Sequence, residues 1–209
     1  MKLKRAAYTV FLLLLCLCLS GCFEYEERIV LNRDGSGTME IEYWTLGDME
    51  IETNDHVFPH MEKDIRKEIK KKYTSDKIRL LDLSVDNKKD SRSVRFKLAF
   101  DNLMDLNEVE QFQDSRIIFK KTGDRILFER DIFLDGDKPD KHGNLFGRLV
   151  VGILETALSN IRFRFEIETP YNITKSNADL TPDKNRAVWK YRLSDVMHQE
   201  KVEMHLTTE

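Results

Sequence analysis

Strict alternation of apolar and charged residues in several short segments is the feature that most limits how this chain can fold. The purest example is Ile161–Glu168, in which Ile or Phe occupies every second position and Arg or Glu the positions between. Ser93–Phe100 and Thr38–Trp44 follow the same period. A period of two puts one set of side chains on the buried face of a strand and the other set in water. The sequence therefore predicts a fold rich in half-buried β-strands.

Turn signals between the alternating segments favour antiparallel pairing. Asn32–Gly37 contains two glycines, which supply the positive φ of a tight hairpin turn. Thr122–Asp124 separates two further strand-like stretches in the same way. Pro170 ends the strand that precedes it, because proline has no N–H for the ladder. The other predicted strands are Phe23–Leu31, Lys77–Val85, Ile117–Lys121, Arg125–Glu129, Val188–Leu193 and Val202–Leu206.

Three segments are predicted to form helices. They are Pro59–Tyr73, Leu103–Phe112 and Leu145–Leu158. In the first, Met61, Ile65 and Ile69 repeat at the i, i+4 spacing of one helix face. Together these elements predict the α+β class: a single domain of residues 22–209 with a largely antiparallel β-sheet and about three helices packed on one face. The other face, with its alternating Lys, Arg and Glu, is expected to lie in water.

The N-terminus has the parts of a secretory signal peptide. Lys2, Lys4 and Arg5 form a short positive segment, and an unbroken apolar run of about ten residues follows it. The run is too short for a spanning helix, which needs roughly 20 apolar residues. Residues 1–21 are therefore predicted to be removed, leaving residues 22–209 as the mature chain.

Leu19-Ser20-Gly21-Cys22 resembles the lipobox of bacterial lipoproteins. The resemblance implies cleavage between Gly21 and Cys22, a diacylglyceryl group on the Cys22 thiol and an N-acyl group on the new amine. Two or more acyl chains hold a protein stably on a membrane. The expected location is the extracytoplasmic side of the bacterial envelope, on the outer membrane if the cell has two membranes and otherwise on the cytoplasmic membrane.

Charge and cysteine content exclude several other classes of protein. The net charge is −3, and loss of the three basic residues of the signal peptide lowers it by three to −6, so a nucleic-acid partner is not expected. The cysteines are Cys16, Cys18 and Cys22, so only the lipidated one remains after cleavage. A disulfide framework, cysteine ligands for zinc and a thiol nucleophile are thereby excluded from the folded part. No cofactor is expected.

Motifs for catalysis or metal binding are weak. His56 and His60 have the spacing of a helical metal pair, but Pro59 lies between them and disfavours a helix. Asp135–Asp140 has three carboxylates without the regular ligand ladder and late Glu of a calcium loop. The sequence contains no G-x-S-x-G elbow, P-loop or dinucleotide-binding glycine motif. We therefore predict a protein that is not an enzyme, with no catalytic residue and no metal site.

Three features are candidates for binding. Leu145–Leu158 is apolar on almost every side, so it is either a buried core helix or the wall of a groove for a lipid or a partner. The basic face from Lys63 to Lys72 either lies in water or meets anionic headgroups. Trp189 is either a ligand contact or an aromatic residue at the edge of the core. The candidate ligand contacts are thus Leu145, Leu149, Ile153 and Trp189.

Two segments together resemble the LppM-like family of bacterial lipoproteins. The first is Cys22 followed by a strand and the turn Arg33-Asp34-Gly35-Ser36-Gly37. The second is the extended stretch from Phe165 through Ser176-Asn177, followed by a strand that contains Trp189. The resemblance covers residues 22–207 and implies an extracytoplasmic lipoprotein domain. Lipid or glycolipid binding is attributed to some members of that family, and it offers no catalytic residues to transfer.

We therefore expect a membrane-anchored, non-enzymatic envelope lipoprotein that binds a lipid, a glycolipid or an envelope protein. The alternatives are a hydrolase at the cell surface and a structural spacer. An apolar cavity beside residues 145–158 would favour ligand binding, whereas converging carboxylates or a Ser/His pair in a cleft would favour the hydrolase.

Overall fold

The structure is a computed structural model that describes residues 23–46, 65–88, 91–134 and 160–209. Its strands form two sheets, with strand orders β3-β4-β2-β1-β7-β10-β9 and β5-β6-β11-β8. The seven-stranded sheet contains β1 (Phe23–Leu31), β2 (Gly37–Leu46), β3 (Ile78–Lys88), β4 (Ser91–Phe100), β7 (Ile161–Glu168), β9 (Leu180–Asp183) and β10 (Arg186–Arg192). The four-stranded sheet contains β5 (Ser115–Thr122), β6 (Arg125–Phe133), β8 (Ile173–Ser176) and β11 (Lys201–Thr208). The helical elements are α2 (Ile65–Tyr73), the 3-10 helices η1 (Leu103–Glu108) and η2 (Glu110–Phe112), and α4 (Leu193–Val196).

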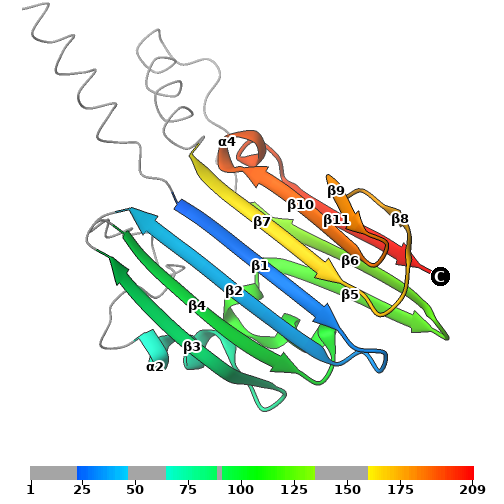
Figure 1. The fold of residues 1–209 in the computed structure, drawn as a ribbon, viewed down its shortest axis with the longest axis horizontal. Helices are drawn as coiled ribbons and strands as arrows, with labels where there is room; N and C mark the ends of the chain where they lie inside the picture. The colour runs from blue at the N-terminus through cyan, green and yellow to red at the C-terminus, as the bar shows by residue number, and fades with distance from the viewer. Residues whose placement is uncertain (1–22, 47–64, 89–90, 135–159) are drawn as a thin grey trace, which may run out of the picture.

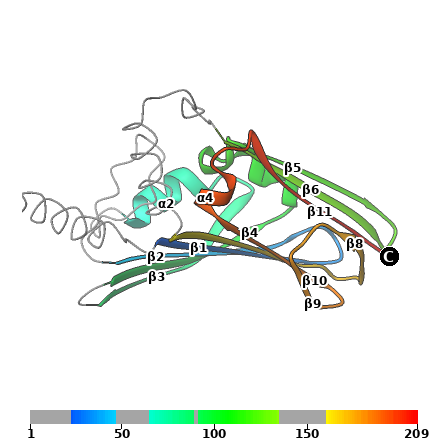
Figure 2. The same cartoon turned by 90° about the horizontal axis from the view of Figure 1, so that it is seen from above.

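The two sheets lie face to face as two layers (Figure 1, Figure 2). Figure 2 shows them close together near the C-terminus and further apart at the other end, where α2 lies on the same side of the seven-stranded sheet as the four-stranded sheet. The 3-10 helix η1 contacts β5 in one sheet and β4 in the other, and η2 contacts α2. The seven-stranded sheet therefore buries its inner face against these elements and leaves its outer face in water, as its alternating sequences require.

The hairpin turns form where the glycines predict them. Gly35 has a φ of +93° in the turn between β1 and β2, and Gly123 has a φ of +62° in the turn between β5 and β6. Both values lie in the region that glycine adopts without steric cost. Asp34 accepts hydrogen bonds from the backbone N–H of Ser36 at 3.0 Å and from its hydroxyl at 2.6 Å. These bonds fix the first turn, and with it the register of β1 on β2.

β1 and β7 form a parallel pair in the middle of the seven-stranded sheet, so both strands begin at the same end. Tyr25 lies beside Phe163 in this pair. β10 runs antiparallel to β7 and finishes at that end, where Arg192 lies beside Arg162. We call this the proximal end, because Phe23, the first residue of β1, lies there (Figure 1).

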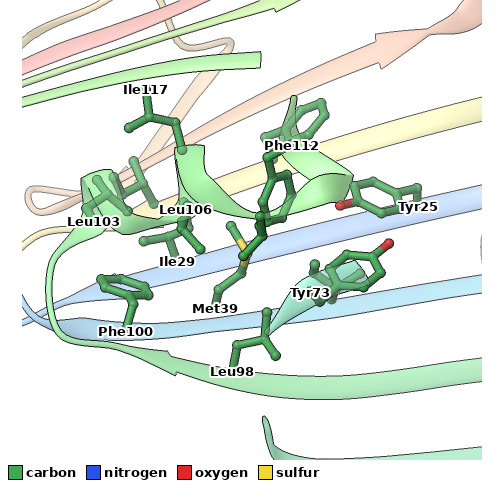
Figure 3. Packing of buried hydrophobic residues seen from close by; sticks show 14 of the residues in the cluster. Tyr25, Ile29, Met39, Tyr73, Leu98, Phe100, Leu103, Leu106, Phe112 and Ile117 are labelled. Carbon is green, nitrogen blue, oxygen red and sulfur yellow. The ribbon is translucent and has the colours of Figure 1, made fainter. Parts of the chain in front are cut away.

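The core lies between the sheets and is built from the apolar positions of the alternating strands. Figure 3 shows residues of η1 and η2 packed against residues of β1, β2 and β4. Full burial of one Leu, Ile, Met or Phe side chain stabilises the folded state by about 1.5–3 kcal/mol. Leu103, Leu106 and Phe112 come from the 3-10 helices, and Ile29, Met39, Leu98 and Phe100 come from the sheet.

The predicted α+β class and the largely antiparallel pairing are confirmed. The division into two sheets was not predicted, because alternation identifies the buried face of a strand but not the sheet that it joins. Leu103–Phe112, predicted as one helix, forms two 3-10 helices on either side of Val109, which is extended. Leu193, predicted as the end of a strand, instead begins α4. The predicted helix at Leu145–Leu158 lies outside the described residues.

Candidate functional site

The outer face of the seven-stranded sheet carries charged side chains in rows that cross the strands. The rows arise because the charged positions of neighbouring alternating strands stand in register. One row runs through Ser93, Trp44, Glu24, Arg162 and Arg192. The next runs through Arg95, Glu42, Glu26, Arg164 and Lys190. In these two rows the carboxylates lie on β1 and β2, and β7 and β10 carry only cations.

A pocket of about 470 Å³ lies at the proximal end of these rows. It is lined by four cations and three carboxylates, together with residues of the aromatic cluster described below. We call it the basic pocket. Its lining residues are Glu24, Tyr25, Glu26, Arg162, Phe163, Arg164, Lys190, Tyr191, Arg192 and Asp195.

The cations of the basic pocket differ in how they are paired. Arg162 Nη1 lies 3.6 Å from a Glu24 carboxylate oxygen. Arg164 Nη2 lies 2.6 Å from a carboxylate oxygen of Glu166. Within the described residues, the exposed side chains of Lys190 and Arg192 form no ion pair. These two cations are therefore the ones that an incoming anion can engage without breaking an existing pair.

An aromatic cluster packs on the inner side of the same strands. The ring centroids of Tyr25 and Phe163 are 6.2 Å apart, and those of Phe165 and Tyr191 are 6.1 Å apart. Burial raises the pKa of Tyr191 to about 12, and the nearby charge of Asp179 adds to this rise. The phenol is therefore neutral at physiological pH. The cluster gives the basic pocket a close-packed, uncharged support.

A buried ion pair joins the two sheets beneath this cluster. Glu27 of β1 and Arg130 of β6 are 2% and 4% exposed, and their charged groups are in direct contact. The Tyr25 hydroxyl donates a hydrogen bond to Glu27 Oε2 at 3.0 Å. The guanidinium carbon of Arg130 lies 5.5 Å from the ring centre of Phe112 and 5.4 Å from that of Phe165. Desolvation by burial, and then the charge of Glu27, raise the pKa of Tyr25 well above its usual value. The buried ion pair therefore links β1 of the seven-stranded sheet to β6 of the four-stranded sheet.

The residues singled out from the sequence fall into two groups. Gly21 and Cys22, the predicted cleavage and lipidation site, lie outside the described residues, as do the candidate contacts Leu145, Leu149 and Ile153. Trp189 lies in the core, where it is 2% exposed. Its indole N–H donates to Asn177 Oδ1 at 2.8 Å, and its ring lies 6.3 Å from that of Phe128. These contacts agree with the interpretation of Trp189 as an aromatic residue of the core. The other interpretation, a ligand contact at Trp189, stays a prediction.

Sequence reasoning missed the buried ion pair, although the sequence carries a signal for it. Glu27 occupies the inward phase of β1, between the buried residues Tyr25 and Ile29. Arg130 likewise continues the inward phase of Phe128 in β6. A charge in the apolar phase of a strand is a mark of a buried pair. The basic pocket had no such signal, because its cations meet only through the pairing of β1, β7 and β10.

The described residues contain no cluster of His, Cys, Asp and Glu side chains that could hold a metal ion. His56, His60 and Asp135–Asp140 lie outside them. Among the described helices, none combines the length and the apolar character needed to cross a bilayer.

Comparison with known proteins places the chain in a family. Residues 17–205 match the model of the LIC11874-like family. The chain belongs to the LIC11874-like family. The NMR structure of the folded domain of the LppM protein from Mycobacterium tuberculosis is similar, with 10% sequence identity over 90% of each chain and a TM-score of 0.45. No curated protein matches the chain in sequence. The resemblance to LppM-like lipoproteins that we predicted from the sequence is thus matched only by a structural similarity at low sequence identity. The family that the comparison shows is the LIC11874-like family.

Proposed function

We propose that this LIC11874-like protein is a non-enzymatic lipoprotein of the bacterial envelope, anchored through diacylglyceryl and N-acyl groups on Cys22, that binds an anionic lipid at the basic pocket. The observation that carries the proposal is the position of the pocket. β1 begins at Phe23, the residue directly after Cys22, and Glu24 and Glu26 of the same strand line the pocket. A strand rises about 3.3 Å per residue, so the pocket starts within roughly 15 Å of the anchor.

The chemistry of the pocket suits a phosphate-bearing headgroup. Each cation near an anionic membrane surface adds on the order of 1 kcal/mol to binding. Among the cations that line the pocket, Lys190 and Arg192 are the two that form no ion pair within the described residues. An arginine fork bonds a phosphate in two places, and a lysine adds a compact charge. The acyl chains on Cys22 supply the membrane affinity, and the pocket supplies the preference for an anionic lipid.

The anchor is tested by replacing its thiol. Cys22→Ala should abolish both labelling with a radioactive or clickable fatty acid and cleavage of the signal peptide, because both reactions require the thiol. Cys18→Ala, which removes a thiol of the predicted signal peptide, is the matched control and should leave both unchanged. Acyl labelling that persists in Cys22→Ala would refute the anchor.

Lipid binding is tested by native mass spectrometry of the acylated protein extracted from its own membrane. The wild type should retain an anionic lipid. The double variant Lys190→Gln/Arg192→Gln should retain at most about one tenth of that amount of lipid, because two cations are lost from the headgroup site. Lys97→Gln/Lys120→Gln makes the same change in charge on other strands and should match the wild type. Equal retention by the two double variants, or no lipid on the wild type, would contradict the proposal.

A further inference from the structure

A second groove lies on the outer face of the seven-stranded sheet, over β2, β3 and β4. The basic pocket occupies β1, β7 and β10 of the same sheet, so the two sites share no lining residue. The groove has a volume of about 440 Å³. Its lining residues are Glu42, Trp44, Ser84, Asp86, Lys88, Ser91, Ser93 and Arg95.

The charges in this groove are balanced and already paired. Arg95 donates to Glu42 Oε2 from Nη2 at 2.7 Å and from Nε at 3.0 Å. Lys88 Nζ lies 3.5 Å from an oxygen of Asp86. Two cations face two carboxylates, so a charged ligand would have to break an existing pair to gain one. The balance favours an uncharged ligand, in contrast to the surplus of cations in the basic pocket.

The polar groups left in the groove suit a ligand that carries many hydroxyls. The Ser93 hydroxyl donates to Glu42 Oε1 at 3.1 Å. The hydroxyls of Ser84 and Ser91 have no hydrogen-bond partner within the described part of the chain. A hydroxyl donates one hydrogen bond and accepts others, and a carboxylate accepts several. Together they match the mixed donors and acceptors of a sugar ring.

Trp44 adds a flat apolar surface beside these polar groups. Its indole N–H donates to Glu24 Oε2 at 3.0 Å, which fixes the ring beside β1 at the proximal end of the sheet. The side chain is partly exposed and lines the groove. An aromatic ring held at its polar edge offers an apolar face at little cost in conformational entropy. Such a face packs against the C–H side of a sugar ring.

We propose that this groove is a carbohydrate-binding site for uncharged sugar units, with Trp44 as the stacking platform and the serines and paired carboxylates as the hydrogen-bonding wall. The proposal goes beyond the lipid site, because it concerns different residues and needs no acyl anchor. An extended peptide paired to the edge strand β3 would use backbone groups of that strand and would not depend on the indole ring.

The test follows the two indole N–H signals in the NMR spectrum of the mature lipoprotein in detergent micelles. The probes are hexamers of mannose, glucose and N-acetylglucosamine at millimolar concentration, with a hexamer of galacturonic acid as the charged comparison. At least one uncharged hexamer should shift the Trp44 signal. The Trp189 signal should stay in place, because that residue is 2% exposed and bonded within the core.

Substitutions then separate stacking from a change of fold. Trp44→Ala should weaken sugar binding about tenfold or more, since an aromatic contact approaches the free energy of a tenfold change in affinity. Trp44→Phe keeps a flat ring and should restore most of the binding. Thr38→Ala, on the same face of β2 but away from the groove, is the control, and an unchanged Trp189 signal reports an intact core.

Three results would overturn the sugar site. They are no Trp44 shift with any uncharged hexamer, a stronger shift with the galacturonic acid hexamer, and equal affinity in Trp44→Ala and the wild type. Lipid retention by the Lys190→Gln/Arg192→Gln variant is measured separately, so the sugar site can fail while the lipid site stands, and the lipid site can fail while the sugar site stands.

Discussion

At the scale of single residues, the molecule is distinguished by charges placed where alternation predicts apolar side chains. Glu27 and Arg130 meet between the sheets at less than 5% exposure, and Tyr25 donates to the carboxylate. Burial of two ions costs several kcal/mol each, which their mutual attraction and hydrogen bonds only partly return. The pair therefore contributes less to net stability than to fixing how β1 and β6 face one another.

Removing one partner of this pair should be far more costly than replacing both. Arg130→Met leaves Glu27 buried without its cation, and we expect the free energy of unfolding to fall by about 3–5 kcal/mol. The double variant Glu27→Leu/Arg130→Met removes both desolvation costs and should be within about 1 kcal/mol of the wild type, or more stable. Urea unfolding followed by circular dichroism measures both. A single variant as stable as the double one would show that the pair is not buried as described.

Asp34 should make the first turn sensitive to acid. Hydrogen bonds from Ser36, first from its hydroxyl and then from its backbone N–H, lower the pKa of Asp34. The lowered pKa means that the folded state favours the carboxylate, so its stabilisation is present above the ordinary pKa of about 3.9 and is lost as the pH falls through the lower folded value. Asp34→Asn should reduce Tm slightly at neutral pH, and its difference from the wild type should shrink as the pH falls below the ordinary pKa of about 3.9. A difference in Tm independent of pH would contradict this assignment.

At the scale of elements, one edge of the four-stranded sheet is closed by a side chain. β5 is an edge strand, and Asn107 of η1 pairs with it in place of a further strand. The Asn107 amide accepts from the Ile117 N–H at 2.8 Å and donates to the Ile117 carbonyl at 2.9 Å. Edge strands with free backbone groups are sites of aggregation, and natural proteins cover them. η1 thus fills the space between the sheets and also protects β5.

Asn107→Ala should expose this edge. The loss of two hydrogen bonds is expected to cost about 2 kcal/mol in the free energy of unfolding, since each contributes roughly 1 kcal/mol. The variant should also show increased light scattering on mild heating, because β5 gains unpaired backbone groups. Gln113→Ala, at an exposed position after η2, is the control and should behave as the wild type. Unchanged stability and scattering in Asn107→Ala would argue against a protective role.

How well the sequence predicts a strand depends on how strictly apolar and polar residues alternate along it. β4 and β7 are evident from their period of two, and the glycine turns locate two hairpins. β8 and β9 have four residues each and no clear alternation, so their pairing rests on tertiary contacts that the sequence does not display. The basic pocket was missed for a similar reason. The apolar phase shows that Arg164 and Lys190 face outward, but only the pairing of β7 with β10 brings them together.

At the scale of the whole molecule, the sheet has two ends with different roles. The proximal end carries Phe23, the basic pocket and the aromatic cluster that supports it. The opposite end carries the glycine turn at Gly35 and the turn between β9 and β10 at Lys184. β10 alone separates the ends by about 20 Å, given a rise of roughly 3.3 Å per residue. Anchoring at Cys22 would therefore hold one end against the membrane and the other away from it.

The most direct test of this account is photocrosslinking to lipid in the intact cell envelope. A photoreactive amino acid at Asp195, which lines the basic pocket without being one of its cations, is compared with the same amino acid at Lys184, which is also exposed but lies at the far end. We predict crosslinks to anionic phospholipid from position 195 and none from position 184. Equal crosslinking from both positions, or none from position 195, would contradict a lipid-anchored domain whose basic pocket binds an anionic lipid.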